Sequence, residues 1–309
     1  MTSLTAPRFT NEDKAREHLE ALRWPEGPYC PHCGSFNATR LQGTKARPGT
    51  VQCNDCRQQF TVTVGTVFER SKVPLNKWLL CNHLMVSSKK GISAHQIHRM
   101  LGVTYKTAWF MCHRIREAMK QDSGPMGGPG VTVEADETFF GKDKKAPPSR
   151  TPIRNMNKIV SLVDRATGRA TSFVVTDALN AETVSHILYT NVHRSSTLQT
   201  DEANHYKRPG KEFAFHYSVN HRVGEYVRRD DPTVHTNTIE GFFGIFKRGM
   251  KGIYQHCGQQ HLHRYLAEFD FRYTNRMANG FNDDERASEA LKGIAGKRLT
   301  YRRISQLAA

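Results

Sequence analysis

The sequence lacks long hydrophobic runs, and it is poor in acidic residues. No apolar stretch approaches the roughly 18 residues that a membrane-spanning helix needs, and the opening MTSLTAPRFTNEDK lacks the apolar core of a signal peptide. Seven cysteines are an odd number, which argues against the disulfide framework of a small secreted protein. We therefore expect a soluble, intracellular protein with no membrane partner.

What the chain has in excess is positive charge. Its 309 residues carry 45 Lys+Arg against 29 Asp+Glu, a formal net charge of +16. Such an excess favours a polyanionic partner, because neutralising the phosphates of a nucleic acid releases counterions, although charge also serves solubility alone. The length predicts two or three modules, and 38% hydrophobic with 24% charged residues excludes a wholly disordered chain.

Four of the cysteines form two C-x-x-C pairs, Cys30 with Cys33 and Cys53 with Cys56, separated by 19 residues. Each pair can form a tight turn, and four thiolates complete the tetrahedral shell of a structural Zn²⁺. A redox-active C-x-x-C would explain one such pair, but not two at this spacing. With a helix expected over residues 11–23 and a strand in the alternating FTVTVGTVF (60–68), the pattern predicts a zinc ribbon spanning residues 10–68.

A helical pattern follows over residues 75–120. In ISAHQIHRMLGVTYKTAWFMCHRIREAM (92–119), Gly102 marks a tight turn and a second helix begins near Thr104. The pattern is typical of a helix-turn-helix whose second helix presents polar and cationic side chains to the major groove. The candidate DNA contacts in it are Tyr105, Lys106, Thr107, Trp109 and Arg114. The alternative is an ordinary helical hairpin with a solvated basic face.

A Gly/Pro-rich segment, QDSGPMGGPG (121–130), is expected to be a linker at the main domain boundary. Beyond it we expect strands over residues 131–140, 158–166 and 169–177, a helix over 181–193, a strand over 196–201, and helices from near Ile239 and over 261–275. This order predicts an α/β core in which an antiparallel meander leads to a parallel pairing. The core would span residues 131–280, and residues 281–309 would form a C-terminal tail.

Three acidic residues lie where this core could bring them together. Asp136 is near the end of the first strand, Asp201 ends the last strand, and Glu240 lies in the first turn of a helix. Hard carboxylate oxygens suit Mg²⁺, and two such ions stabilise the attacking and leaving oxygens of a phosphoryl displacement.

Each of these acidic residues has an alternative interpretation. Glu134 and Glu137 flank Asp136, so chemistry alone does not choose among the three. Asp201 could be a helix cap or a turn residue, and N-T-I-E fits a capping box formed by Asn237 and Glu240.

The helix that contains Glu240 also carries basic residues. Glu240, Gly244, Lys247 and Lys251 recur along one stripe. A carboxylate followed by lysines on one helix stripe suits a site where metal ions and a DNA phosphate meet, so we expect Lys247, Arg248 and Lys251 to contact DNA. A solvated charged stripe is the alternative.

Taken together, VEADETFFGK, TDEANHY and HTNTIEGFFGIFKRGMKGIYQHC resemble bacterial insertion-sequence transposases of the DDE class, in the Merlin-related group that begins with a zinc ribbon. The resemblance extends through RWPEGPYCPHCGS and LGVTYKTAWFMCHRIREAM and covers about residues 10–280. It departs at Lys142, where a second glycine is expected. The resemblance implies an RNase-H-like core with an acidic triad of Asp136, Asp201 and Glu240, and with Asn237 and Lys247 as motif companions.

The resemblance also implies an activity and partners. The triad would hold two Mg²⁺ ions, for which Mn²⁺ can substitute. The activity would be cleavage and strand transfer of double-stranded DNA at the element ends and the target. The protein would form a homodimer or larger synaptic assembly and lie at the nucleoid in the bacterial cytoplasm. A non-catalytic DNA-binding regulator and a simple RNase-H-like nuclease are the alternatives. Four C-terminal residues could pass for a metal cluster, but we interpret them as helix-packing and DNA-contacting residues: His256, Cys257, His261 and His263.

Overall fold

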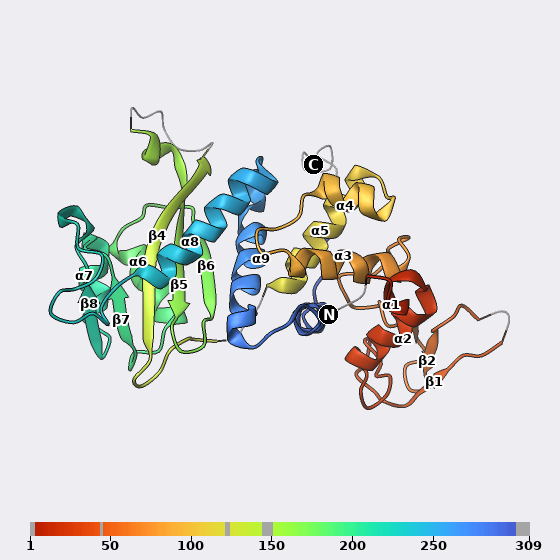
Figure 1. Ribbon diagram of the computed structural model, residues 1–309. Coiled ribbons are helices and arrows are strands. Elements are labelled where there is room, and N and C mark those ends of the chain that lie inside the picture. The colour runs from red at the N-terminus through yellow and green to blue at the C-terminus, as the bar shows by residue number, and fades with distance from the viewer. Residues whose placement is uncertain (1–3, 44–45, 121–123, 144–150, 301–309) are drawn as a thin grey trace, which may run out of the picture. The chain divides into compact units, whose positions relative to one another are not determined.

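The computed structural model describes residues 4–43, 46–120, 124–143 and 151–300 (Figure 1). Residues 121–123 of the expected linker and 301–309 of the expected tail lie outside this part of the chain. The chain divides into two units: Met1–Lys120 with Phe281–Ala309, and Gln121–Gly280. No helix among the described residues is both long and apolar enough to cross a membrane.

The N-terminal unit begins with two helices and a small sheet. These elements are α1 (Pro7–Thr10), α2 (Glu12–Arg23), β1 (Ala38–Arg40), β2 (Val51–Cys53) and β3 (Gln59–Phe60), with the strands antiparallel in the order β1-β2-β3. The strand expected over residues 60–68 is wrong beyond Phe60, because the chain there forms successive turns through Gly65 at φ +71°. Val62 and Val67 are still buried, so the alternating apolar pattern records burial through turns rather than through a strand.

Three helices follow, α3 (Leu75–Ser87), α4 (Ala94–Leu101) and α5 (Tyr105–Met119). Gly102 ends α4 in the left-handed conformation at φ +59°, which costs glycine little because it has no Cβ. Thr104 caps α5 by accepting the N–H of Thr107 on its hydroxyl. The turn and the start of the second helix therefore lie where the sequence indicated.

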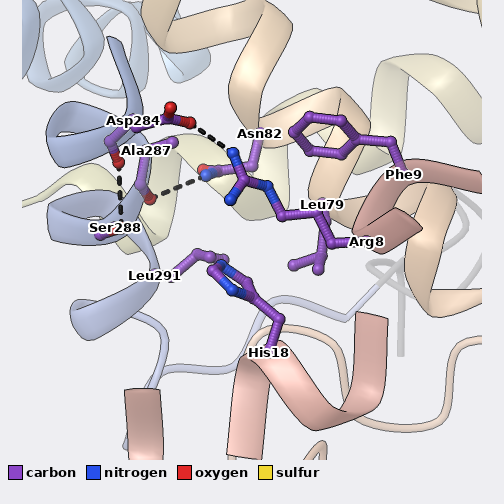
Figure 2. Close-up of a pocket in the computed structure, with 9 residues that line it drawn as sticks. All are labelled: Arg8, Phe9, His18, Leu79, Asn82, Asp284, Ala287, Ser288 and Leu291. Carbon is purple, nitrogen blue, oxygen red and sulfur yellow. Dashed lines mark hydrogen bonds and ion pairs between the residues drawn. The ribbon is translucent and has the colours of Figure 1, made fainter. Parts of the chain in front are cut away.

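The expected C-terminal tail is instead part of this unit. Residues Asp283–Lys292 form α10, which packs on α2, α3 and α5. Figure 2 shows its contacts: Arg8 of α1 pairs with Asp284, and the Asn82 side chain of α3 donates to the Ala287 carbonyl at 2.9 Å. A tail assignment fails here because the amphipathic helix completes the hydrophobic interior formed by residues far upstream.

The second unit is built on a five-stranded sheet in the order β6-β5-β4-β7-β8. Its strands are β4 (Thr132–Lys142), β5 (Met156–Asp164), β6 (Ala170–Val175), β7 (Thr197–Thr200) and β8 (Phe215–Ser218). The first three form an antiparallel meander, and β7 and β8 run parallel to β4. The predicted meander and parallel pairing are confirmed.

Helices cover both faces of this sheet. They are α6 (Ala181–Asn191), α7 (Asn204–Gly210), α8 (Asn237–Gly249) and α9 (Leu262–Thr274). Because neighbouring strand residues face opposite sides, Val160 packs with α6 and α7, whereas Ile159 packs with α8 and α9. Phe242 and Phe246 anchor α8 in the second of these layers, and π-helical turns (Met250–Tyr254) follow it directly.

The described part of the Gly/Pro-rich segment, residues 124–130, packs within this unit. Met126 is 2% exposed, and its backbone bonds with Asn191 and His193. Gly127 takes φ +86°, and a Cβ there would lie 2.2 Å from the Ser196 hydroxyl. Gly127 therefore allows the chain to pass close to Ser196, where the sequence had suggested a free linker.

Candidate functional site

The four paired cysteines of the N-terminal unit converge. Their sulfurs lie within 4.8 Å of one another, and the Cys30–Cys56 and Cys33–Cys53 separations are both 3.6 Å. Tetrahedral Zn²⁺ with 2.3 Å bonds places its sulfurs roughly 3.8 Å apart. Four thiol ligands at these spacings fit a structural zinc ion.

The backbone around the cysteines supports the same conclusion. Gly34 and Arg57, which follow the second cysteine of each pair, both adopt a left-handed conformation, at φ +80° and +62°. Backbone N–H groups of Cys56 and Asp55 lower the pKa of the Cys53 thiol to about 7, whereas burial and the neighbouring thiols raise the pKa of Cys56 to about 12.

The acidic site of the second unit follows from the parallel pairing of β4 with β7. Glu134 pairs with Gln199, so two residues further along the register Asp136 lies opposite Asp201. Carboxylate oxygens of Asp136, Glu137 and Asp201 lie within 4.8 Å of one another. The N–H of Ala203 donates to Asp201 at 2.9 Å and fixes the turn that follows β7.

The electrostatics of this cluster favour a cation. Burial, followed by the charges of Glu137 and Asp201 and with a smaller part from Glu240, raises the pKa of Asp136 well above its usual value. Burial also raises the pKa of Asp201, against the lowering effect of the Ala203 N–H. Crowded hard oxygen donors that repel one another are the donor set that Mg²⁺ prefers, so these residues fit a divalent ion.

Glu240 stands at the edge of this cluster. Its side chain is 38% exposed, accepts the Thr236 hydroxyl and lies 3.2 Å from His221 Nε2. The alternative interpretation of Asn237 and Glu240 as a capping box is wrong. Thr236 is the N-cap residue of α8, and its side chain makes no capping hydrogen bond to the backbone. Glu240 lies in the first turn of α8, outside the group of carboxylate oxygens within 4.8 Å of one another, and its charge adds a small part to the raised pKa of Asp136. Asn237 lies exposed in the same turn.

Glu134 has a different role from its neighbours. It is fully buried, accepts the Ile239 N–H at 2.8 Å and pairs with Arg165. Arg165 also donates to Gln199 and to the His235 carbonyl. Glu134 thus ties the N-terminus of α8 to β4 and is a structural residue, which the sequence left open.

Sequence reasoning missed the contacts around Glu137. His205 Nε2 and the Tyr206 hydroxyl reach its carboxylate at 3.1 and 3.0 Å. His205 and Tyr206 lie in the motif TDEANHY, but nothing in the spacing of that motif predicted a contact with Glu137 on β4. His221 was also missed, because its segment carries no periodic pattern.

The expected DNA contacts divide into two groups. Tyr105 is 44% exposed and its ring stacks on His95, Lys106 is exposed, and Thr107 and Trp109 are partly exposed. On α8 and the turns after it, Lys247, Arg248 and Lys251 are all exposed. Each of these side chains is therefore at least partly exposed to solvent.

The structure corrects the interpretation of Arg114 as a DNA contact. It is 7% exposed, donates to the Glu69 carbonyl and lies over the Trp78 ring. Residues 111–116 are all buried, because α3, α4 and α10 pack around this half of α5. Arg114 therefore belongs to the interior of the unit and not to a groove-facing surface.

The four C-terminal candidates do not gather around a common point. Among the described residues, the groups of three or more potential metal ligands are the four paired cysteines and the cluster of Asp136, Glu137 and Asp201. The His261 ring lies 3.0 Å from the Arg264 guanidinium.

Comparisons with known proteins found matches to two family models, to a relative and to a solved structure. Residues 126–274 match the model of the ISXO2-like transposase domain, and residues 10–59 match the transposase zinc-ribbon domain. A protein of Halobacterium salinarum described as "Uncharacterized protein in transposable element ISH50" is 27% identical over 280 residues, which are 85% of this chain and 91% of the relative. A chain from a simian T-cell lymphotropic virus intasome, solved with PP2A regulatory subunit B56 gamma, aligns with 16% identity and a TM-score of 0.29 over 56% of this chain and 63% of that chain. The chain is thus similar to insertion-sequence transposases over a zinc ribbon and, further along the chain, over an ISXO2-like transposase domain.

Proposed function

We propose that the chain is a DDE transposase that cuts DNA at the ends of its element and joins these ends to a target. The observation that carries this proposal is the convergence of Asp136 and Asp201 from the parallel strands β4 and β7, and the charge of Glu240 in the first turn of α8 also acts on Asp136. No other described residues bring carboxylates together in this way.

Asp136, Asp201 and Glu240 would hold two Mg²⁺ ions, for which Mn²⁺ can substitute. When bound, such ions stabilise the attacking and leaving oxygens of an in-line displacement. The chain's own contribution is to fix the donors before DNA arrives: the strand pairing sets two of them, and the anchor between Glu134 and Ile239 sets the helix that carries the third. Lys247 lies exposed two turns beyond Glu240 and would bind a DNA phosphate, and Asn237, exposed in the first turn of α8, would be a further residue of the site.

The N-terminal unit would hold the element ends. Its zinc ribbon and its α4–α5 hairpin, with Tyr105 and Lys106 exposed, would bind the terminal inverted repeats as double-stranded DNA. Because two ends must be cut and joined together, we propose a homodimer or larger synaptic assembly. Such a protein would work on the nucleoid in the cytoplasm.

The test is a joining assay with the full-length, zinc-loaded protein. Linear DNA carrying the flanking ends is incubated with a target plasmid, with and without Mg²⁺, in resin-treated buffer rather than with a chelator that would strip the zinc. We expect joined products that need Mg²⁺ and vanish in Asp201→Asn, while Glu182→Gln, an exposed carboxylate at the start of α6, behaves as wild type.

The other outcomes identify the alternatives. Binding of the ends by folded protein without metal-dependent cleavage would contradict the proposal and favour a DNA-binding regulator. Cleavage without joining would indicate a simple nuclease.

A further inference from the structure

Glu137 occupies an unusual place on β4. As the neighbour of Asp136 it belongs to the opposite face of the strand, the face that packs on α6 and α7. Nevertheless its carboxylate lies within 4.8 Å of those of Asp136 and Asp201. The reason is that β7 ends at Thr200, so the chain beside Glu137 is no longer covered by that strand.

Two side chains of α7 hold this carboxylate in place. His205 Nε2 and the Tyr206 hydroxyl both bind Glu137 Oε2, at 3.1 and 3.0 Å. In the second of these bonds the Tyr206 hydroxyl is the donor. Within the described residues no hydrogen bond is recorded on Oε1, which leaves that oxygen open to a cation.

The charge of Glu137 is poorly compensated by the protein. Its side chain is 14% exposed, and its recorded partners in the described chain, His205 and Tyr206, carry no fixed positive charge. Two further carboxylates lie beside it. Removing a carboxylate from water without an opposite charge is costly, so a group in this position is expected to pair with a cation.

We propose that Glu137 is a further ligand of the divalent cation between Asp136 and Asp201, oriented by His205 and Tyr206. This inference rests on the proposed function, and it extends the acidic set of the site from three carboxylates to four. Outer hydrogen bonds that orient a ligating group are a common feature of metal sites, and α7 follows Asp201 directly in the chain. Helix α7 thus follows the turn that contains Asp201 and also holds the side chain of Glu137.

The test measures metal affinity rather than activity. Full-length, zinc-loaded protein is titrated with Mn²⁺ in chelator-free buffer, and the free ion is followed by electron paramagnetic resonance. Glu137→Gln keeps the size of the side chain and an acceptor for Tyr206, so we expect at least a roughly tenfold loss of Mn²⁺ affinity. Glu182→Gln is the matched control and should bind as wild type. Tyr206→Phe keeps the carboxylate and should lose less affinity than Glu137→Gln.

A second measurement needs no variant and covers the case in which Glu137→Gln does not fold. Carboxyl groups of the wild-type protein are labelled with a carbodiimide and an amine, with and without Mn²⁺, and the modified residues are quantified by mass spectrometry. We expect Mn²⁺ to protect Glu137 together with Asp201 and to leave Glu182 unchanged.

The outcomes separate this inference from the proposed function. If Asp136→Asn loses Mn²⁺ affinity while Glu137→Gln retains it, or if Mn²⁺ protects Asp201 but not Glu137, then Glu137 is a packing residue and the inference is wrong. If Asp136→Asn also binds Mn²⁺ as wild type, the metal site itself is wrong and the proposed function fails with it.

Discussion

Replacing Asp136 by Asn is expected to stabilise the metal-free protein while it abolishes catalysis. The pKa of Asp136 is raised by burial and by neighbouring carboxylates, so its ionised form is unfavourable in the folded chain. Because the pKa of Asp136 in the folded protein lies above its unfolded value of 3.8, the protonated side chain stabilises the fold at low pH, and this contribution is lost as the pH rises. The gain from Asp136→Asn should therefore be absent below about pH 4 and grow above it.

The structure sets the size of the effect. Two unit charges 4.8 Å apart repel by about 3.5 kcal/mol at an effective dielectric constant of 20. Solvent screening of the partly exposed Asp201 reduces this, so we expect a gain of about 1–3 kcal/mol at neutral pH, equivalent to about 2–10 °C in the melting temperature.

Magnesium should reverse the order of stability. A ligand at about 1,000 times its dissociation constant stabilises the folded state by about 4.1 kcal/mol, which exceeds this gain, and it does so only for a protein that keeps its site. Thermal melting of wild type and Asp136→Asn, in resin-treated buffer with and without Mg²⁺, measures both effects. Asp230→Asn is the control, because its partner Arg228 lowers the pKa of Asp230 and no stabilisation is expected. A lower melting temperature for metal-free Asp136→Asn, or an equal response of both proteins to Mg²⁺, would refute the reasoning.

Three further predictions concern the scaffold. Cys53→Ser should lose the bound zinc and unfold the N-terminal ribbon, measured by metal content and circular dichroism; retention of the metal would contradict the four-thiolate site. Arg165→Met should lower the free energy of unfolding by about 3–5 kcal/mol in urea titrations, since it leaves Glu134 buried without its partner, and a change below about 1 kcal/mol would contradict that role. Burial raises the pKa of Asp270, which accepts the N–H and hydroxyl of Ser172, to about 7, so stability should fall as the pH rises from about 4 to about 7. Asp270→Asn should abolish this fall in the free energy of unfolding between about pH 4 and about pH 7. An unchanged pH dependence in the variant would show that another group is responsible.

The parts of the fold that depend on local pattern could be predicted well. The two C-x-x-C turns, the glycine end of α4 and the meander of β4, β5 and β6 each depend on residues close together in the chain. Short elements escaped prediction, because β8 (Phe215–Ser218) has four residues and no clear alternation. The same holds for α7, which is seven residues long and contains Pro209.

Roles that depend on distant partners could not be predicted. Arg114 lies on the polar side of an amphipathic pattern, yet α10, from the far end of the chain, helps to bury its half of α5. Among Glu134, Asp136 and Glu137 the sequence offered three equal carboxylates, since a pleated strand alternates faces but does not say what covers each face.

The sequence by itself determined the chemistry that this protein carries: four thiolates for zinc, a basic surface, and acidic residues at the ends of predicted strands. Only the tertiary structure decided which neighbours surround each acidic residue. The register of β4 on β7 brings Asp136 to Asp201, α8 takes Glu134 as its anchor, and α7 turns Glu137 toward the cluster. The physical reason is that a carboxylate's role follows from its solvation and its neighbours, and those neighbours come from segments that the chain brings together only on folding.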